Sequence, residues 1–485
     1  MGLCYIFPVA VKELEKYIKP GLTEAEVDEL LSLKPDEIRW AFLEITARWQ
    51  QDREILDSSQ TGEIIPDSST PSGQIPVYEK PNAKRRRGKV GAREGHPGKR
   101  REAPERIDEV REHTLERCPC CGEALEAAFE ERERITEDIP EVKPVITKHI
   151  IKRYRCKHCG KTVEGRVTEA LPRAALGNKV LALTAWMHYA LGTTMSQIIA
   201  VLNSHLSFKI SEGGLVEMWH RLAKILDEWY EQIALEARSE AVLHADETGW
   251  RVNGKTHWLW CFTSKNLTCY FINRSRGLPA LLEFMGETFS GCLITDFWSA
   301  YNLIACESRQ YCLAHMFREI DKVDASNKSE EWKLFKKKLT RLLKDAVRLN
   351  QAEGVDDETW ESRYARLLDR LDIICREHDS DHDVVRLCKR LRKYSHGMFT
   401  FLIDENVHHT NNHAEREIRP AVIMRKVIQQ NRGDKAAHTQ EVLMSVYRTL
   451  KLRGHDPVKT VVDALSIYLE TGKLPVLPGV TMSDG

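Results

Sequence analysis

The sequence predicts a multidomain α+β protein whose mixed α/β core is interrupted by a helical insertion. Three observations predict this class. The length of 485 residues exceeds what one hydrophobic core usually organises. The apolar spacing is helical on both sides of residues 241–325 and changes there to short strand-like runs. Paired cysteines and a linker rich in Ser, Thr and Pro precede these regions.

Composition and periodicity divide the chain into eight segments. In order, they are a helical N-terminal region that could dimerise, a linker with a basic arm, a cysteine-rich module, a helical region, the first part of the core, the helical insertion, the remainder of the core and a helical tail. Their bounds are 1–57, 58–106, 107–170, 171–240, 241–325, 326–402, 403–435 and 436–485.

The charge is balanced over the whole chain but not along it. Lys plus Arg and Asp plus Glu each total 72, yet ten basic residues and one acidic residue lie between Lys80 and Arg101. Such a block repels itself unless a polyanion neutralises it, although a merely solvated linker is the alternative. The basic side chains of this arm include Arg85, Arg86, Arg87, Lys89, Lys99, Arg100 and Arg101.

Composition also bears on the compartment. No run of about 18 apolar residues is present, so no membrane span or membrane partner is expected. The first apolar residues are soon interrupted by Lys12 and Glu13, which argues against a secretory signal. Thirteen cysteines without such a signal are typical of reduced thiols in a cytosol. We therefore expect a cytoplasmic protein.

The helical region contains a break that could belong to a helix-turn-helix. Residues 178–238 have helical spacing, and the break falls at Ser204–Gly213. Plain helical packing would produce the same pattern, and both interpretations stay open.

From Ala241 onward the pattern indicates strands. Asn253-Gly254 is a type I′ hairpin signal, because both positions tolerate positive φ. Antiparallel strands around this hairpin would thus precede a helix and further strands. The expected strands are 241–246, 250–252, 256–260, 267–272, 292–296 and 310–312, and the expected helices are 278–285, one beginning at 299, 314–323, several within 326–402, 410–426, 436–453 and 457–472.

Two Cys-x-x-Cys pairs, each followed by glycine, are separated by 34 residues. Each pair can place two thiolates on one tight turn, as two corners of a tetrahedron. We predict one structural zinc ion, with a redox dithiol pair or coincidence as alternatives. Cys120 could replace a neighbouring ligand. The predicted ligands are Cys118, Cys121, Cys156 and Cys159.

Three carboxylates stand in unusual contexts. Asp246 and Asp296 each end an apolar run that resembles a central strand, where a buried carboxylate without a cation is costly. Glu415 lies on a helix-like segment. Each carboxylate alone has an ordinary structural explanation, as a residue at a strand end or on a solvated helix face. Together they form the oxygen ligand set that two hard divalent cations about 3.5–4 Å apart require for phosphoryl transfer.

The neighbours of these carboxylates refine the prediction. Glu247 and Glu417 could be mistaken for ligands, but adjacent residues on a strand or helix point to different faces. Amide and basic side chains surround Glu415, as in a site that grips phosphates. They are Asn411, Asn412, His413, Arg416, Arg419, Arg425 and Lys426.

Four ordered motifs carry a family resemblance. They are His-Ala-Asp-Glu-Thr at 244–248, Asp296-x-x-x-x-Tyr301, Cys312-x-x-His315-x-x-Arg318, and Asn411-Asn412-x-x-Glu415-Arg416-x-Ile418-Arg419-Pro420. With the Gly-x-Arg-Glu-Gly-His-Pro-Gly arm at 91–98 and the cysteine pairs, they make nearly the whole chain resemble the insertion-sequence-66 family of bacterial transposases.

The resemblance implies a DDE transposase with a ribonuclease H-like catalytic core. Asp246, Asp296 and Glu415 would bind two catalytic Mg²⁺ ions, for which Mn²⁺ could substitute. His315 and Arg318 would contact DNA or support a carboxylate. The other expected DNA contacts are the basic arm, Asn412, Arg416, Arg419, Arg425 and Lys426.

The implied partners are double-stranded DNA at element ends and target, further copies in a homodimer or larger assembly, and accessory proteins. The implied location is the bacterial nucleoid in the cytoplasm. The implied reaction is cleavage at an element end, followed by attack of the freed 3′-hydroxyl on target DNA. A nuclease of the same fold and a DNA-binding regulator with an idle core are the alternatives, and retention of all three carboxylates argues against the regulator.

The sequence departs from the family pattern in two places. Phe297-Trp298 replaces a common glycine-tyrosine pair, and Val427-Ile428-Gln429-Gln430 replaces an aromatic-rich run. Neither departure removes a predicted ligand, but the second weakens any DNA-stacking role for that segment.

Overall fold

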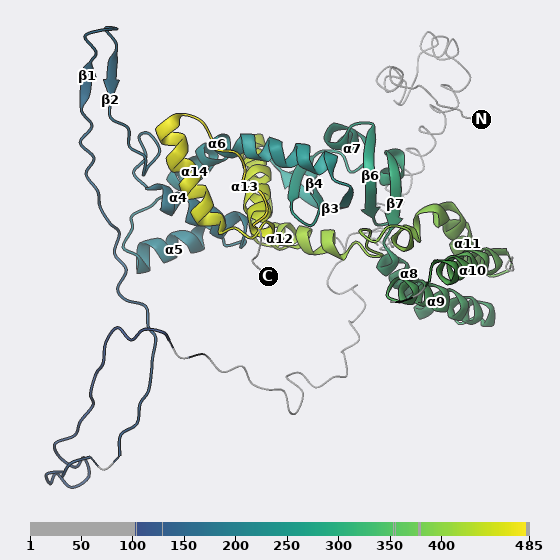
Figure 1. The fold of residues 1–485 in the computed structure, drawn as a ribbon, viewed down its shortest axis with the longest axis horizontal. Coiled ribbons are helices and arrows are strands. Elements are labelled where there is room, and N and C mark those ends of the chain that lie inside the picture. The colour runs from purple at the N-terminus through teal and green to yellow at the C-terminus, as the bar shows by residue number, and fades with distance from the viewer. Residues whose placement is uncertain are drawn as a thin grey trace. The chain divides into compact units, whose positions relative to one another are not determined.

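A computed structural model describes Glu102 and residues 104–128, 130–352, 354, 356–376 and 380–481 (Figure 1). The chain divides into two compact units, Met1–Ala83 and Lys84–Gly485, and every described residue belongs to the second. The predicted N-terminal helices, the linker up to Ala83 and the basic arm up to Arg101 lie outside the described residues.

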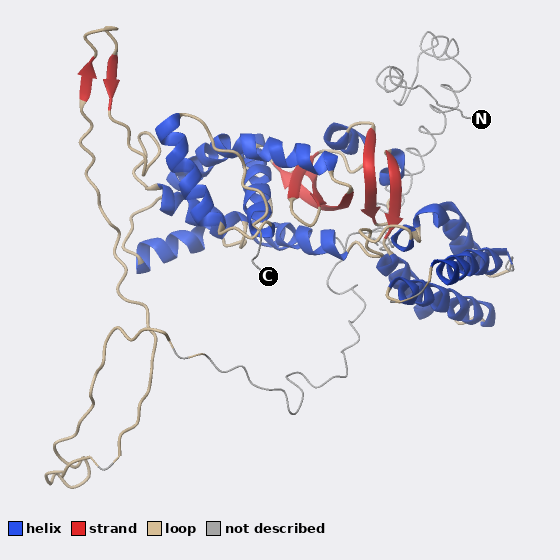
Figure 2. Cartoon of the chain, in the orientation of Figure 1, coloured by secondary structure: helices blue, strands red, loops and turns tan. Residues whose placement is uncertain are grey.

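A five-stranded mixed sheet forms the centre of the described fold, with the strands drawn in red in Figure 2. Its order is β5-β4-β3-β6-β7. The first three of these pair antiparallel, whereas β3, β6 and β7 run parallel. The strands are β3 (Val242–Val252), β4 (Lys255–Thr263), β5 (Thr268–Asn273), β6 (Thr288–Thr295) and β7 (Ala305–Tyr311).

The strand predictions are confirmed in type and corrected in extent. The predicted strands 241–246 and 250–252 form one continuous strand, β3, because Glu247, Thr248 and Gly249 keep their ladder partners on β4. Asn253 and Gly254 have φ of 50° and 72°, as the hairpin prediction requires. β7 begins at Ala305, six residues before Tyr311. The helix predicted to begin at 299 is a 3₁₀ helix, η2 (Ser299–Leu303).

The helical region and the tail share one apolar core with the sheet. Helices α6 and α13 pack on each other, and both contact β5. Trp219 and Tyr447 tie this core to α4, through hydrogen bonds to Thr184 Oγ1 at 3.1 Å and Ala182 O at 2.8 Å. The helices concerned are α4 (Asn178–Tyr189), α5 (Met195–His205), α6 (Glu212–Ser239), α13 (Asp434–Leu452) and α14 (Pro457–Thr471).

A second apolar core belongs to the helical insertion. It also includes Phe297 and Tyr311, whose rings stack with their centroids 5.2 Å apart. The insertion therefore packs against the segment that follows β6. Its helices are α9 (Glu330–Asn350), α10 (Asp357–Arg376) and α11 (His382–Tyr394). The preceding helix α8 (Leu313–Ser326) shares this apolar core, and α7 (Leu278–Met285) connects β5 to β6.

The cysteine-rich module contains one small antiparallel pair, β1 (Arg153–Arg155) and β2 (Thr162–Glu164). β1 ends immediately before Cys156, the first cysteine of the second pair. Among the helices that the structure describes, none combines the length and the hydropathy needed to cross a bilayer.

Candidate active site

The parallel pairing of β3 with β6 determines how two of the predicted carboxylates lie. Val242, Leu243 and His244 pair with Cys292, Leu293 and Ile294. Continued two residues beyond the last pair, the same register would set Asp246 opposite Asp296. Neighbouring strands lie about 4.8 Å apart. The register would therefore place the two carboxylates at adjacent positions, where β6 ends. Both side chains are half-buried.

Asn411 joins the segment of the third carboxylate to β3. Its Nδ2 donates to the carbonyl of Ala245 at 2.8 Å, and its Oδ1 accepts from His244 Nδ1 at 3.0 Å. Its backbone N–H donates to Cys312 Sγ at 3.1 Å, and Cys312 N in turn donates to Thr295 O at 2.9 Å. Asn411 is 1% exposed, so its place in the motif reflects this buried connection rather than a grip on phosphates.

Glu415 lies in the first turn of α12 (Asn412–Ile428), which packs against β3 and β4. Arg318 of α8 donates from Nη1 to Glu415 Oε1 at 3.0 Å and from Nη2 to Oε2 at 2.9 Å. Such a two-point contact fixes the orientation of the carboxylate. Arg318 therefore supports a carboxylate in this structure, which is one of the two roles expected for it.

The pKa of Asp246 depends on carboxylates from all three acidic segments. Burial raises the pKa of Asp246 well above its usual range, and the carboxylates of Glu247, Asp296 and Glu415 raise it further. Charges of the same sign so close together disfavour the ionised form of each carboxyl, and a cation between them removes that penalty. The site therefore has both the hard oxygen donors and the negative potential that a divalent cation requires.

Glu247 lies beside this site, which the sequence did not predict. Its buried carboxylate accepts from Tyr301 Oη at 2.6 Å and from Arg276 Nε at 3.1 Å. Burial and the charge of Asp296 raise the pKa of Glu247 to about 7, against the opposing effect of Arg276 and Tyr301. Tyr301 lies five residues after Asp296. This spacing was the sequence signal that could have linked the motif of Asp296 and Tyr301 to the motif that contains Glu247.

Arg276 is itself held between two aromatic rings. Its guanidinium carbon lies 4.5 Å from the ring centroid of Trp258 and 4.0 Å from that of Trp298. The Trp298 backbone N–H donates to Asp296 Oδ1 at 2.8 Å. The Phe297-Trp298 departure from the family pattern thus supplies packing around Asp296 and removes no acidic ligand.

Glu417, the other acidic neighbour, faces away from the site as expected. Its carboxylate is buried and forms ion pairs with Arg416 and Arg448. Those arginines and its own hydrogen bonds lower the pKa of Glu417 despite the opposing effect of burial. It serves the packing of α12 on α13.

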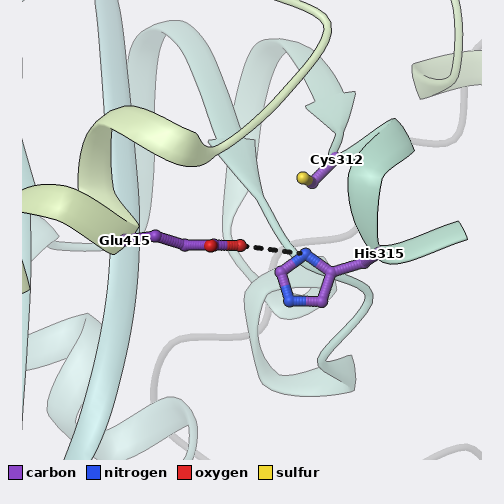
Figure 3. Close-up of side chains that lie close together, drawn as sticks. All are labelled: Cys312, His315 and Glu415. Carbon is purple, nitrogen blue, oxygen red and sulfur yellow. Dashed lines mark ion pairs between the residues drawn. The ribbon is translucent and has the colours of Figure 1, made fainter. Parts of the chain in front are cut away.

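A tighter group of metal-type donors lies on the α8 side of Glu415. In the part of the chain that the structure describes, ligand atoms of Cys312, His315 and Glu415 lie within 4.8 Å of one another (Figure 3). The oxygens of Asp246, Asp296 and Glu415 do not together meet this criterion among the same residues.

The predicted DNA contacts on α12 fall into two groups. Asn412, Arg416, Arg419 and Lys426 are exposed, and their spacing of three, four and seven residues places them on one face of the helix. Arg425 is half-buried, and its Nη1 donates to Thr248 Oγ1 and Gly249 O, both at 2.8 Å. Arg425 thus anchors α12 to β3.

The cysteine pairs form two knuckles of the same shape. Gly122 N donates to Cys118 O at 2.8 Å and Gly160 N donates to Cys156 O at 2.9 Å, and both glycines have positive φ. Neighbouring backbone amides lower the pKa of the first thiol of each pair, as suits a metal-binding thiolate. The four sulfurs do not form one group within 4.8 Å among the described residues, so their shared zinc ion stays a prediction.

Two family models match the chain. The one described as the transposase IS66 family matches residues 173–439, and the one described as the zinc-finger binding domain of transposase IS66 matches residues 116–160. The first range contains Asp246, Asp296 and Glu415, and the second contains all four predicted zinc ligands. No curated protein matches the chain.

Proposed function

Since the chain belongs to the IS66 family of transposases, we propose that it cleaves DNA at the ends of an insertion element and joins the freed 3′-hydroxyl to target DNA. The substrates are double-stranded element ends and a double-stranded target. Both reactions are phosphoryl transfers, in which positioning and charge neutralisation do most of the catalytic work.

One observation supports this proposal most strongly: the register of β3 with β6, which would set Asp246 opposite Asp296 if continued two residues beyond its last pair. Asn411 then connects β3 to the start of α12, so that Glu415 is offered from the next element. Three acidic side chains that are far apart in sequence would thereby face one region at the end of the central strands.

Asp246, Asp296 and Glu415 are the residues that would hold the catalytic cations. When bound, a pair of Mg²⁺ ions would activate the attacking oxygen and stabilise the leaving one. The donor set fits such ions because all three side chains offer hard carboxylate oxygens. Arg318 keeps the Glu415 carboxylate in one orientation. Glu247, which lies beside the site, accepts hydrogen bonds from Tyr301 and Arg276.

The exposed face of α12 would position the DNA. Asn412, Arg416 and Arg419 follow one another along the helix from the turn that carries Glu415. Arginine and amide donors of this kind contact phosphate oxygens and fix the register of the duplex without reading its sequence. The basic arm at Lys80–Arg101 and the cysteine-rich module would add further phosphate contacts.

The cysteine-rich module is proposed to fold around one structural zinc ion. Its two knuckles offer two thiols each, and a closed tetrahedral site of four thiolates leaves no position for substrate. The role of this ion is therefore to order the module for DNA binding. Both ends of the element must be held at once, so the active form is a dimer or larger assembly.

A strand-transfer assay tests the proposal against a nuclease of the same fold. The full-length protein is incubated with Mg²⁺, a labelled element end that is already cut, and a supercoiled target plasmid. We expect labelled, joined products. Cleavage of an uncut end without any joining in this assay would indicate the nuclease, and binding without either product would indicate the regulator.

A further inference from the structure

A second set of metal-type donors shares Glu415 with the carboxylate site. Cys312 immediately precedes α8, His315 lies in the first turn of α8, and Glu415 comes from α12. Figure 3 shows the His315 ring and the Glu415 carboxylate pointing toward each other, with the Cys312 sulfur beside them. One donor atom from each residue lies within 4.8 Å of the other two.

His315 provides an independent indication that something binds between these residues. Arginine can only donate, so His315 Nε2 accepts from Arg318 Nη1 at 3.2 Å. The opposite ring nitrogen, Nδ1, is buried and has no hydrogen-bond partner, and it lies 3.7 Å from Glu415 Oε1. A buried polar nitrogen without a partner is destabilising, and a cation bound to the ring protonated at Nε2 would give Nδ1 a partner.

The donor types differ from those of the carboxylate site. A sulfur and an imidazole nitrogen favour cations such as Zn²⁺ and Co²⁺ over Mg²⁺, which prefers oxygen. The distances are close to those of a tetrahedral zinc site, in which nitrogen and oxygen ligands at about 2.0 Å from the metal lie about 3.3 Å from each other. The gap between His315 and Glu415 thus needs to close by only a few tenths of an ångström.

We propose that Cys312, His315 Nδ1 and Glu415 bind one divalent cation of the zinc class, and that this cation withdraws Glu415 from the pair of catalytic ions. The binding site itself does not depend on the proposed function, whereas its inhibitory effect rests on it. A transposase with such a site would be switched off by zinc-class cations and active with Mg²⁺.

Arg318 is the side chain that must adjust. Coordination through His315 Nδ1 requires the proton to sit on Nε2, so the Arg318–His315 hydrogen bond breaks when the cation binds. Arg318 can keep its contact with Glu415 Oε2, because a carboxylate has lone pairs on both oxygens. The site is therefore open to a cation without loss of the main α8–α12 contact.

The binding experiment uses metal-depleted full-length protein titrated with Co²⁺, which reports thiolate coordination through a charge-transfer absorption band. Cys312→Ser keeps a polar acceptor for the Asn411 N–H but removes the thiolate. Cys388→Ser, a buried cysteine of α11, is the matched control. Circular dichroism and the melting temperature of each variant verify folding.

We expect wild type and Cys388→Ser to bind one equivalent of Co²⁺ more than Cys312→Ser does. The remaining thiolate signal of Cys312→Ser belongs to the cysteine-rich module and should disappear when Cys156→Ser is added. An identical titration for a folded Cys312→Ser variant and wild type would overturn the site.

The inhibition experiment adds Zn²⁺ to DNA cleavage reactions at constant Mg²⁺, and each protein is compared with its own zinc-free rate. Cys312→Ser should need at least about tenfold more Zn²⁺ for half inhibition than wild type. Equal inhibition of both proteins would overturn the inhibitory role. A failure of all variants to cut DNA, with Co²⁺ binding intact, would refute the proposed function and leave the cation site standing.

Discussion

Arg318 of α8 holds both carboxylate oxygens of Glu415 on α12, with hydrogen bonds of 3.0 and 2.9 Å. The two residues are 97 positions apart, and the helical insertion lies between them in sequence. The contact therefore couples α8, the helix that leads into the insertion, to the element that offers the third carboxylate. It also makes the orientation of Glu415 depend on a residue outside the strands.

Replacing Arg318 should impair cleavage without unfolding the protein. Arg318→Lys keeps the charge but loses the two-point contact, so Glu415 becomes free to rotate. Outer contacts of this kind are worth about 10- to 100-fold in metal affinity or activity. We expect a single-turnover cleavage rate lower by that factor and a higher Mg²⁺ requirement. Arg366→Lys, an exposed position on α10, is the control, and an unchanged Mg²⁺ dependence in Arg318→Lys would contradict the assignment.

Glu247 should make stability depend on pH. Its pKa of about 7 in the folded protein is above the ordinary 4.5, so the folded state holds this proton more tightly than the unfolded state. Stability from Glu247 is therefore greatest below pH 4.5 and declines as pH rises to about 7, by at most about 3 kcal/mol. In buffer without divalent cations, Glu247→Gln should show a flatter melting temperature over this window. Parallel wild-type and variant curves would exclude this role.

The two groups of arginines on α12 should respond differently to substitution. Arg419→Ala on the exposed face should weaken DNA binding and reduce the salt dependence by about one phosphate contact. Arg425→Ala should instead lower the melting temperature, because it removes two hydrogen bonds that hold α12 to β3. Binding isotherms at several salt concentrations and thermal melts distinguish these effects. A stable Arg425→Ala protein with reduced salt dependence would reverse the two roles.

Loss of zinc from the cysteine-rich module should leave both apolar cores intact. Both apolar cores begin after the module, at Leu171 and Cys292, so neither contains a module residue. Cys156→Ser should therefore remove one zinc equivalent, expose residues 107–165 to protease and weaken DNA binding, while the main thermal transition stays in place. Zinc analysis and limited proteolysis check this, with Cys388→Ser as the control. Full zinc content in Cys156→Ser would show that the ligand set is wrong.

Local sequence patterns were sufficient for many elements and insufficient for their extent. The helix at 278–285 and the Asn253-Gly254 hairpin depend on nearby residues, and both were predicted correctly. The middle of β3 was missed because Glu247 and Gly249, on either side of Thr248, have little strand propensity of their own. They are extended because β4 pairs with them. Long-range pairing of this kind leaves no periodic signal in one sequence.

The candidate site, like the fold, could be predicted only in part from local sequence patterns. Asp246, Asp296 and Glu415 are predicted from their contexts, but the register that would set Asp246 opposite Asp296 is a property of the folded sheet. The proximity of Cys312, His315 and Glu415 depends on how α8 and α12 pack, and so does the burial of Asn411. Spacing along the chain could not distinguish a residue that grips phosphate from one that connects two elements.

The central claim is that Asp246, Asp296 and Glu415 face one shared pair of divalent ions. Iron-mediated backbone cleavage tests it most directly: Fe²⁺ replaces Mg²⁺, ascorbate and peroxide generate radicals at the ion, and mass spectrometry maps the cuts. The account predicts cuts around all three residues that excess Mg²⁺ suppresses and that Asp246→Asn or Asp296→Asn removes at all three places, whereas Asp463→Asn does not. Cuts confined to the neighbourhood of Glu415, or unchanged in Asp246→Asn and Asp296→Asn, would contradict it.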